Sequence, residues 1–185
     1  TFFNGVNTPS HNIRFSYDYT IKEKIEIGAS VTGYSSLEDQ NSTTNYEEGQ
    51  QISYEFSRRG LKDWKSAQIN LFANYKISEN TKIEFSYDIL NYENYTNYNA
   101  LFDESIPNLP ADIFTEKESP FDIRVSKMDF ESLLFKKINF TAGFKYIKSD
   151  FTNIKLVNIN GQIQSEYSNQ RILDEYVMVV YCQAN

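Results

Sequence analysis

The chain has 185 residues, 40% of them hydrophobic, and 14 Tyr with 14 Phe supply nearly all of its aromatic side chains. The formal net charge of −7 disfavours nucleic acid as a partner, because phosphate binding needs a concentrated basic surface. No apolar run approaches the roughly 18 residues that a membrane helix requires, which excludes a helical membrane protein but leaves a membrane β-barrel open.

The first element in chain order is a predicted hairpin over residues 13–34. Apolar and polar side chains alternate from Ile13 to Thr20 and again from Ile25 to Thr32, around a short polar turn. Alternation with a period of two predicts strands that have one apolar and one polar face.

The segment from about residue 35 to residue 66 is predicted as a long connection. It is rich in Ser, Thr, Asn, Asp and Glu, and it alternates only weakly over residues 51–56. We therefore expect Arg58, Arg59, Gly60 and Trp64 to lie in an exposed loop.

A second hairpin is predicted over residues 67–91, with a short turn at residues 78–81. A long loop over residues 91–119 follows, because Pro107 and Pro110 forbid regular ladder pairing in their neighbourhood. This loop holds several large aromatic residues that we expect to contact a ligand: Tyr92, Tyr95, Tyr98 and Phe102.

The third hairpin, over residues 121–150 with its turn at residues 134–137, has the clearest alternation on its second arm. Its first arm changes phase, since Ile123 and Val125 fall in one alternation and Met128 and Phe130 in the other. A β-bulge, or an exit from the apolar band near Ser126, explains such a change.

A polar segment over residues 153–171 leads to a last strand at 172–181. The chain thus has about seven strands whose connections alternate between short and long, which is typical of outer-membrane barrels with short periplasmic turns and longer outer loops. The predicted fold class is all-β, an antiparallel up-and-down transmembrane β-barrel segment, with residues 1–185 forming one partial barrel domain.

Several short stretches resemble a known family: K-M-D-F-E at 127–131, L-L-F-K-K at 133–137, G-F-K-Y at 143–146 and D-E-Y at 174–176. They resemble the outer-membrane β-barrel family of Bacteroidota that is similar to the barrel half of TonB-dependent receptors. The resemblance implies a barrel on the order of 22 strands with a plugged lumen, of which seven strands are only a part. It also implies a plug domain and the TonB system as partners, by analogy.

Lipid exposure fixes which strand face points outward, because an Arg or Lys turned to lipid near the bilayer midplane costs roughly 2 to 4 kcal/mol. The residues expected to face lipid are Phe15, Tyr17, Ile83, Phe85, Phe140 and Phe144. The residues expected to face the lumen are Arg14, Asp18, Glu26, Glu84, Asp88, Arg124 and Lys145.

Catalytic chemistry finds little support in the sequence. The single histidine, His11, has no second histidine for a metal site and lies in a loop-like stretch, and Cys182 is the only cysteine. We expect no enzyme activity, no metal and no cofactor.

The function that the sequence favours is uptake of a small solute through a receptor-like barrel in the outer membrane of a Gram-negative bacterium, with outer-membrane lipid as its surroundings. Two alternatives stay open: a structural or adhesive barrel without transport, and a soluble secreted β-sandwich that binds a partner. The sequence does not identify the solute, since sugars, peptides and siderophores all offer flat or apolar faces to Tyr.

Overall fold

The computed structural model describes residues 3–48, 51–102, 112–135 and 137–184, and the side chains of 8–43, 57–101, 112–135 and 137–184. Every regular element in this part of the chain is a β-strand. The strands are β1 (Phe3–Asn7), β2 (Ser10–Ile21), β3 (Ile25–Glu48), β4 (Gln51–Ser78), β5 (Thr81–Phe102), β6 (Asp112–Glu118), β7 (Phe121–Leu134), β8 (Ile138–Ile159), β9 (Gln162–Ile163) and β10 (Asn169–Ala184).

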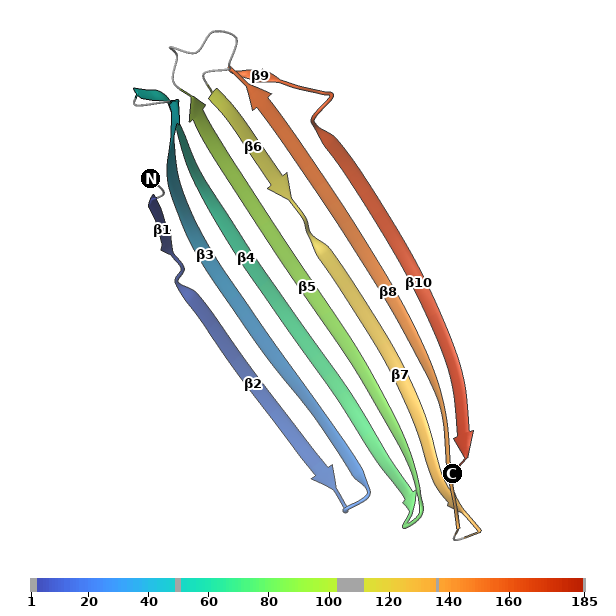
Figure 1. Cartoon of the computed structure of the whole chain (residues 1–185). Helices are drawn as coiled ribbons and strands as arrows, with labels where there is room; N and C mark the ends of the chain where they lie inside the picture. The colour runs from blue at the N-terminus through green and yellow to red at the C-terminus, as the bar shows by residue number, and fades with distance from the viewer. Residues whose placement is uncertain (1–2, 49–50, 103–111, 136, 185) are drawn as a thin grey trace.

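The ten strands form one antiparallel sheet and occupy seven positions across it (Figure 1). β1 and β2 pair with β3 in one continuous register, and β6 and β7 do the same between β5 and β8. Ser119 and Pro120 separate β6 from β7, and Pro120 has no N–H to donate to a ladder. The seven positions match the predicted number of strands.

The three predicted tight hairpins are confirmed, and their turns lie at the same end of the sheet, where the strands of each hairpin meet (Figure 1). Two of the turns use residues in the left-handed backbone region, with φ of 50° at Lys22, 57° at Glu23 and 53° at Phe135. We call the part of the sheet next to these turns the turn half and the remainder the far half.

The predicted long loops are largely wrong, because most of their residues continue the strands. β3 runs on to Glu48, β4 begins at Gln51, and β5 reaches Phe102. Arg58, Arg59, Gly60 and Trp64 therefore lie inside β4, while Pro107 and Pro110 fall outside the described residues. Ladder hydrogen bonds join backbone atoms, so a Ser- and Asn-rich segment pairs as readily as an alternating one when a neighbouring strand is present.

The predicted bulge near Ser126 is also absent from the described pairing of β7. Residues Phe121–Leu134 pair without a register shift against β8, and the pairing with β5 is equally regular. The other explanation, an exit from the apolar band, fits this register. The change of phase in the sequence marks a change in which face of the sheet is apolar.

One hairpin was not predicted. β8 and β9 are joined by Asn160 and Gly161, whose φ values are 49° and 81°. Asn-Gly with positive φ at both positions is the signature of a tight type I′ turn, and it lies in a segment that had been assigned as loop.

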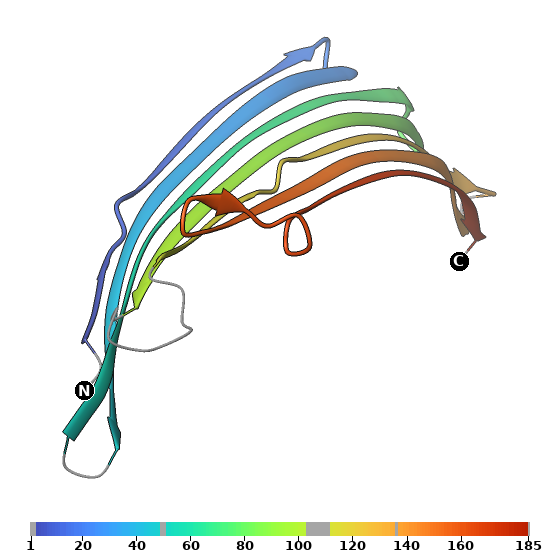
Figure 2. The same ribbon diagram turned by 90° about the horizontal axis from the view of Figure 1, so that it is seen from above.

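The sheet is a single curved layer (Figure 2). Val157, at 6% exposure, is the one buried hydrophobic residue among those described, while Phe15 and Tyr17 are 69% and 70% exposed. All described strands belong to this one sheet, so the β-sandwich alternative does not fit the chain. The part of the chain that the structure describes contains no helix long and apolar enough to cross a membrane.

Candidate functional site

The strand registers divide the side chains of the sheet into two faces. We name them after two successive residues of β8, so that one is the Phe144 face and the other is the Lys145 face. The Phe144 face carries the six residues that the sequence predicts to meet lipid: Phe15, Tyr17, Ile83, Phe85, Phe140 and Phe144. Large apolar residues elsewhere on this face are exposed as well, with Met178 at 68% and Val180 at 76%. Contact of these residues with lipid stays a prediction.

The Lys145 face carries six of the seven residues predicted to line the lumen: Arg14, Asp18, Glu26, Glu84, Asp88 and Lys145. The seventh, Arg124, is assigned wrongly. It pairs with Ile89 and with Lys148, which places it on the Phe144 face, opposite an apolar residue of β5 and beyond the apolar residues of β7 itself. Its neighbours Ile123 and Val125, which set the expected phase, lie on the Lys145 face instead.

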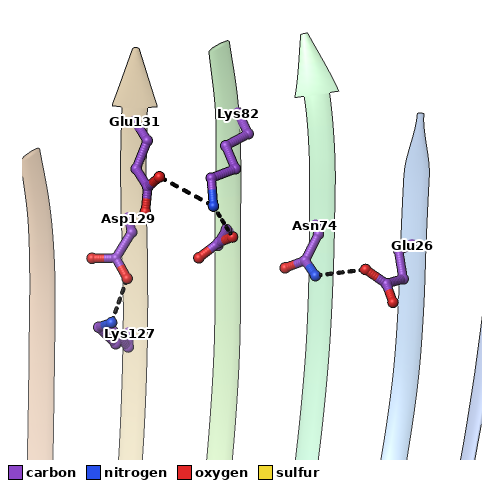
Figure 3. Close-up of polar contacts among 7 residues, drawn as sticks. Glu26, Asn74, Lys82, Lys127, Asp129 and Glu131 are labelled. Atoms are coloured by element: carbon purple, nitrogen blue, oxygen red, sulfur yellow. Dashed lines mark hydrogen bonds and ion pairs between the residues drawn. The ribbon is translucent and has the colours of Figure 1, made fainter. Parts of the chain in front are cut away.

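In the turn half, polar side chains of the Lys145 face bridge neighbouring strands (Figure 3). The Lys82 ammonium lies 2.6 Å from a Glu84 oxygen and 3.1 Å from a Glu131 oxygen, which joins β5 to β7. Asn74 donates a hydrogen bond to Glu26 at 2.9 Å and thereby joins β4 to β3. These contacts satisfy charged and amide groups across four adjacent strands.

A second cluster on the same face spans three strands. Lys127 pairs with Asp129 on β7, and the Tyr181 hydroxyl of β10 donates a hydrogen bond to the same carboxylate. Tyr181 reaches Asp129 by crossing over Gly143 of β8, whose missing side chain leaves room for the ring. Asp129 is only 7% exposed, so its charge depends on these partners.

The arrangement of an aromatic ring over a glycine recurs on this face. Phe72 covers Gly28, with which it is paired, and Tyr98 covers its partner Gly60. A Cβ atom on any of these glycines would collide with the ring. Glycine therefore serves here to let a large side chain lie flat against the sheet.

In the far half, the polarity of the two faces is exchanged. The Phe144 face now carries charged rows such as Asp122, Asp150 and Asp174, which are paired across β7, β8 and β10. On the Lys145 face, Leu90 pairs with Ile123, and the apolar side chains of Val125 and Ile147 lie opposite each other. Beyond the apolar band, the Lys145 face is thus the more apolar of the two.

A line of four regularly spaced aromatic rings crosses the far half, and we call it the aromatic row. It consists of Trp64, Tyr92, Phe121 and Phe151, from β4, β5, β7 and β8. Successive ring centroids are 6.4 Å apart, and each pair meets edge to face. Such spacing and geometry are favourable for aromatic pairs.

Of the four predicted ligand-contacting residues, Tyr92 belongs to the aromatic row. Tyr98 lies on the same face, with the Arg58 guanidinium 3.8 Å from the centre of its ring. Tyr95 lies on the opposite face, and the side chain of Phe102 is outside the described residues. All four lie in β5 and not in a loop.

Sequence reasoning missed two members of the row, Phe121 and Phe151, and placed Trp64 at a loop tip. Their positions in the chain show no common spacing, because the row runs across the strands and not along them. The signal that could have found them is the register of the third hairpin, which pairs Phe121 with Phe151.

Comparison with known proteins yields a match in structure alone. No family model matches the chain, and no curated protein matches it significantly in sequence. The ferric yersiniabactin uptake receptor FyuA from Yersinia pestis matches 97% of this chain with a TM-score of 0.66 and 10% sequence identity. The chain spans 26% of the length of that receptor.

The strand order, the exposed apolar face and this likeness define the fold. The chain is an all-β, antiparallel up-and-down segment of the β-barrel type, similar in fold to part of this uptake receptor. At 10% identity the likeness extends to the fold and not to a ligand or a reaction.

Proposed function

We propose that the chain is part of an outer-membrane β-barrel of the TonB-dependent receptor kind and takes part in uptake of a solute. The observation that carries this proposal is the division of the turn half into one exposed apolar face and one hydrogen-bonded polar face. A sheet with an apolar face of this size needs lipid or protein to cover it. A barrel wall places that face against lipid and the polar network in the lumen.

The apolar band also has a suitable shape for a tilted barrel wall. On β2 and β3 it extends from Ile21 and Ile25, beside their turn, to Ile13 and Val31. On β7 and β8 it begins at Leu134 and Ile138, also beside their turn, which lies four residues beyond the ladder row that contains Ile25. The band therefore runs obliquely across the ladder. Strands that tilt relative to a barrel axis need such a stagger.

The partners that this proposal implies are outer-membrane lipid, a plug domain and the TonB system. A place among Bacteroidota proteins rests on the sequence resemblance alone. The amino-acid sequence that precedes this chain in the full protein separates uptake from a structural or adhesive role. A plug domain behind a TonB-contacting segment supports uptake, and a barrel without them supports the alternative.

The barrel itself is tested on the full-length protein that contains this chain. We expect it to fractionate with the outer membrane, to need detergent for extraction, and to migrate faster on a gel when unheated than when boiled. A full-length protein that stays monomeric in plain buffer, with no change in migration on heating, contradicts the proposal.

A further inference from the structure

The charges of the far half are sorted between the two faces of the sheet. From the aromatic row to the far ends of the strands, the described residues of the Lys145 face include five cations and one acid. These are Arg58, Lys62, Lys117, Lys155 and Arg171, with Glu38. The Phe144 face over the same span carries six acids and two cations: Asp39, Asp63, Glu93, Asp112, Glu116 and Glu118, with Arg59 and Lys65. Asp122, Asp150 and Asp174 form the next row of this face on the turn side of the aromatic row.

Three of the cations form a row across the strands, which we call the lysine row. Lys62 pairs with Thr96, Thr96 with Lys117, and Lys117 with Lys155. Lys117 and Lys155 are direct neighbours, and like charges in that position are destabilising. Among the described residues, neither has a carboxylate within 4.0 Å.

On the Phe144 face, by contrast, the charges of two lysines are each paired with a nearby carboxylate. Lys65 lies 2.7 Å from Asp63, and that hydrogen bond raises the pKa of Lys65. Lys148 lies 2.8 Å from Asp150. The chain has a net charge of −7, so carboxylates are plentiful, and the lysine row is set on the face where they are scarce.

The row between the aromatic rings and the lysines offers hydrogen-bonding groups. Asn153 accepts a hydrogen bond from Ser119 at 2.9 Å and is paired with Arg171. Asn94 lies opposite Trp64, and the Lys62 ammonium lies 4.0 Å from the centre of the Trp64 ring. Aromatic, amide and cationic groups thus follow one another in successive rows on one face.

We propose that this face binds an anionic solute that carries a ring, with the ring against the aromatic row and the anionic group at the lysine row. The aromatic rings supply flat apolar surface, and the neighbouring amides hydrogen-bond the polar edge of a ring. An anion between Lys117 and Lys155 removes their mutual repulsion. The inference rests on the proposed uptake function and deepens it by naming the class of solute.

Pyridoxal 5′-phosphate is a suitable probe, because it has a ring and a phosphate and forms a reducible bond with lysine amines. The full-length protein in detergent is treated with this probe and borohydride, and the labelled lysines are mapped by mass spectrometry. We expect Lys117 and Lys155 to be labelled at least tenfold faster than Lys65 and Lys148. Added 4-methylumbelliferyl phosphate should slow the labelling, and the neutral 4-methylumbelliferyl glucoside should not.

Equilibrium dialysis with 4-methylumbelliferyl phosphate measures binding without a covalent bond. The double variant Lys117→Gln, Lys155→Gln should bind it about tenfold more weakly than the unchanged protein, and Phe121→Leu should also weaken binding. Lys148→Gln is the matched control, since it removes a cation from the other face of β8 and should have no effect.

The outcomes separate this inference from the proposed function. A protein that shows heat-dependent migration, yet labels all four lysines equally and binds the phosphate no better than the glucoside, overturns the inference and leaves the barrel standing. A protein without heat-dependent migration overturns the barrel and, with it, the inference. Preferential labelling that the phosphate alone suppresses supports both.

Discussion

The turn half and the far half of this sheet share β3, β4, β5, β8 and β10 but have opposite polarity. Near the turns, the Phe144 face is apolar and the Lys145 face holds ion pairs such as that of Lys82 with Glu131. Towards the far ends, the Phe144 face becomes acidic and the Lys145 face carries the aromatic row. In the proposed barrel, a strand that leaves the lipid layer meets water on its outer side, and we propose that this transition accounts for the exchange.

The comparison explains why β7 looked irregular in sequence. Met128 and Phe130 belong to the apolar face of the turn half, and Ile123 and Val125 belong to the apolar face of the far half. A regular strand that crosses the boundary between the halves changes the phase of its apolar residues without a bulge. The period-two pattern of apolar residues therefore indicates which face of a strand is apolar as well as where the strand lies.

The largest expected effect comes from a charge on the apolar face of the turn half. Phe144→Arg should destabilise the folded barrel by about 2 to 4 kcal/mol, because the guanidinium would be turned to lipid. The folded fraction is measured by gel migration of unheated samples over a urea series. Lys145→Gln, one residue further along β8, is the control and should change little. Equal losses in the two variants would remove the difference between the faces.

A smaller effect is expected where Tyr181 crosses Gly143. Gly143→Ala places a Cβ against the ring and the Asp129 carboxylate, and overpacking of this kind typically costs about 1 to 3 kcal/mol. The same urea series measures the loss. Gly33→Ala is a matched control, since a Cβ there meets nothing within 4 Å. If the two alanine variants were equally stable, the ring would not depend on the glycine.

In the far half, Phe121→Leu should destabilise the protein by roughly 1 kcal/mol. The leucine keeps an apolar side chain at this position but removes the edge-to-face contacts with Tyr92 and Phe151. Each such aromatic contact contributes about 0.5 to 1.5 kcal/mol to stability. Near-ultraviolet circular dichroism should also change, because the row is interrupted at its centre. An unchanged spectrum would indicate that the rings do not interact in solution.

The smallest effect is expected at the boundary between the halves. Arg124→Gln should alter stability by no more than about 0.5 kcal/mol, since Arg124 lies on the Phe144 face beyond the apolar residues of β7 itself. Urea unfolding measures it beside Arg14→Gln, on the other face. A loss above 2 kcal/mol at Arg124 would mean that its guanidinium has a buried partner.

Much of the turn half could be predicted from the sequence, and little of the far half could. The clean alternation around Phe140 and Phe144 is produced by one apolar and one polar environment, so it reveals strands, turns and faces together. Between residues 35 and 66 both faces carry mostly polar side chains, and the alternation disappears although the ladder continues. The Asn160–Gly161 turn was the one local signal in the far half that could have been used.

The candidate site escaped prediction for a related reason. Trp64, Phe121 and Phe151 become neighbours only through strand register, which depends on where the turns lie. Tyr92, which we expected in a loop, lies in β5 as a member of the aromatic row, and its contact with a ligand stays a prediction. Composition points to aromatic residues, and pairing decides which of them share a face.

The exchange of polarity between the two halves is tested most directly by measuring lipid contact on both sides of the boundary. In a cysteine-free form of the full-length protein, which includes Cys182→Ser, single cysteines replace Phe144, Lys145, Ile147 or Lys148, and each carries a fluorescent label. Lipids with a nitroxide in the acyl chain quench labels that touch the hydrocarbon. We predict strong quenching at position 144 and little at 145, 147 and 148. Quenching at position 145, or equal quenching at all four positions, would contradict the account.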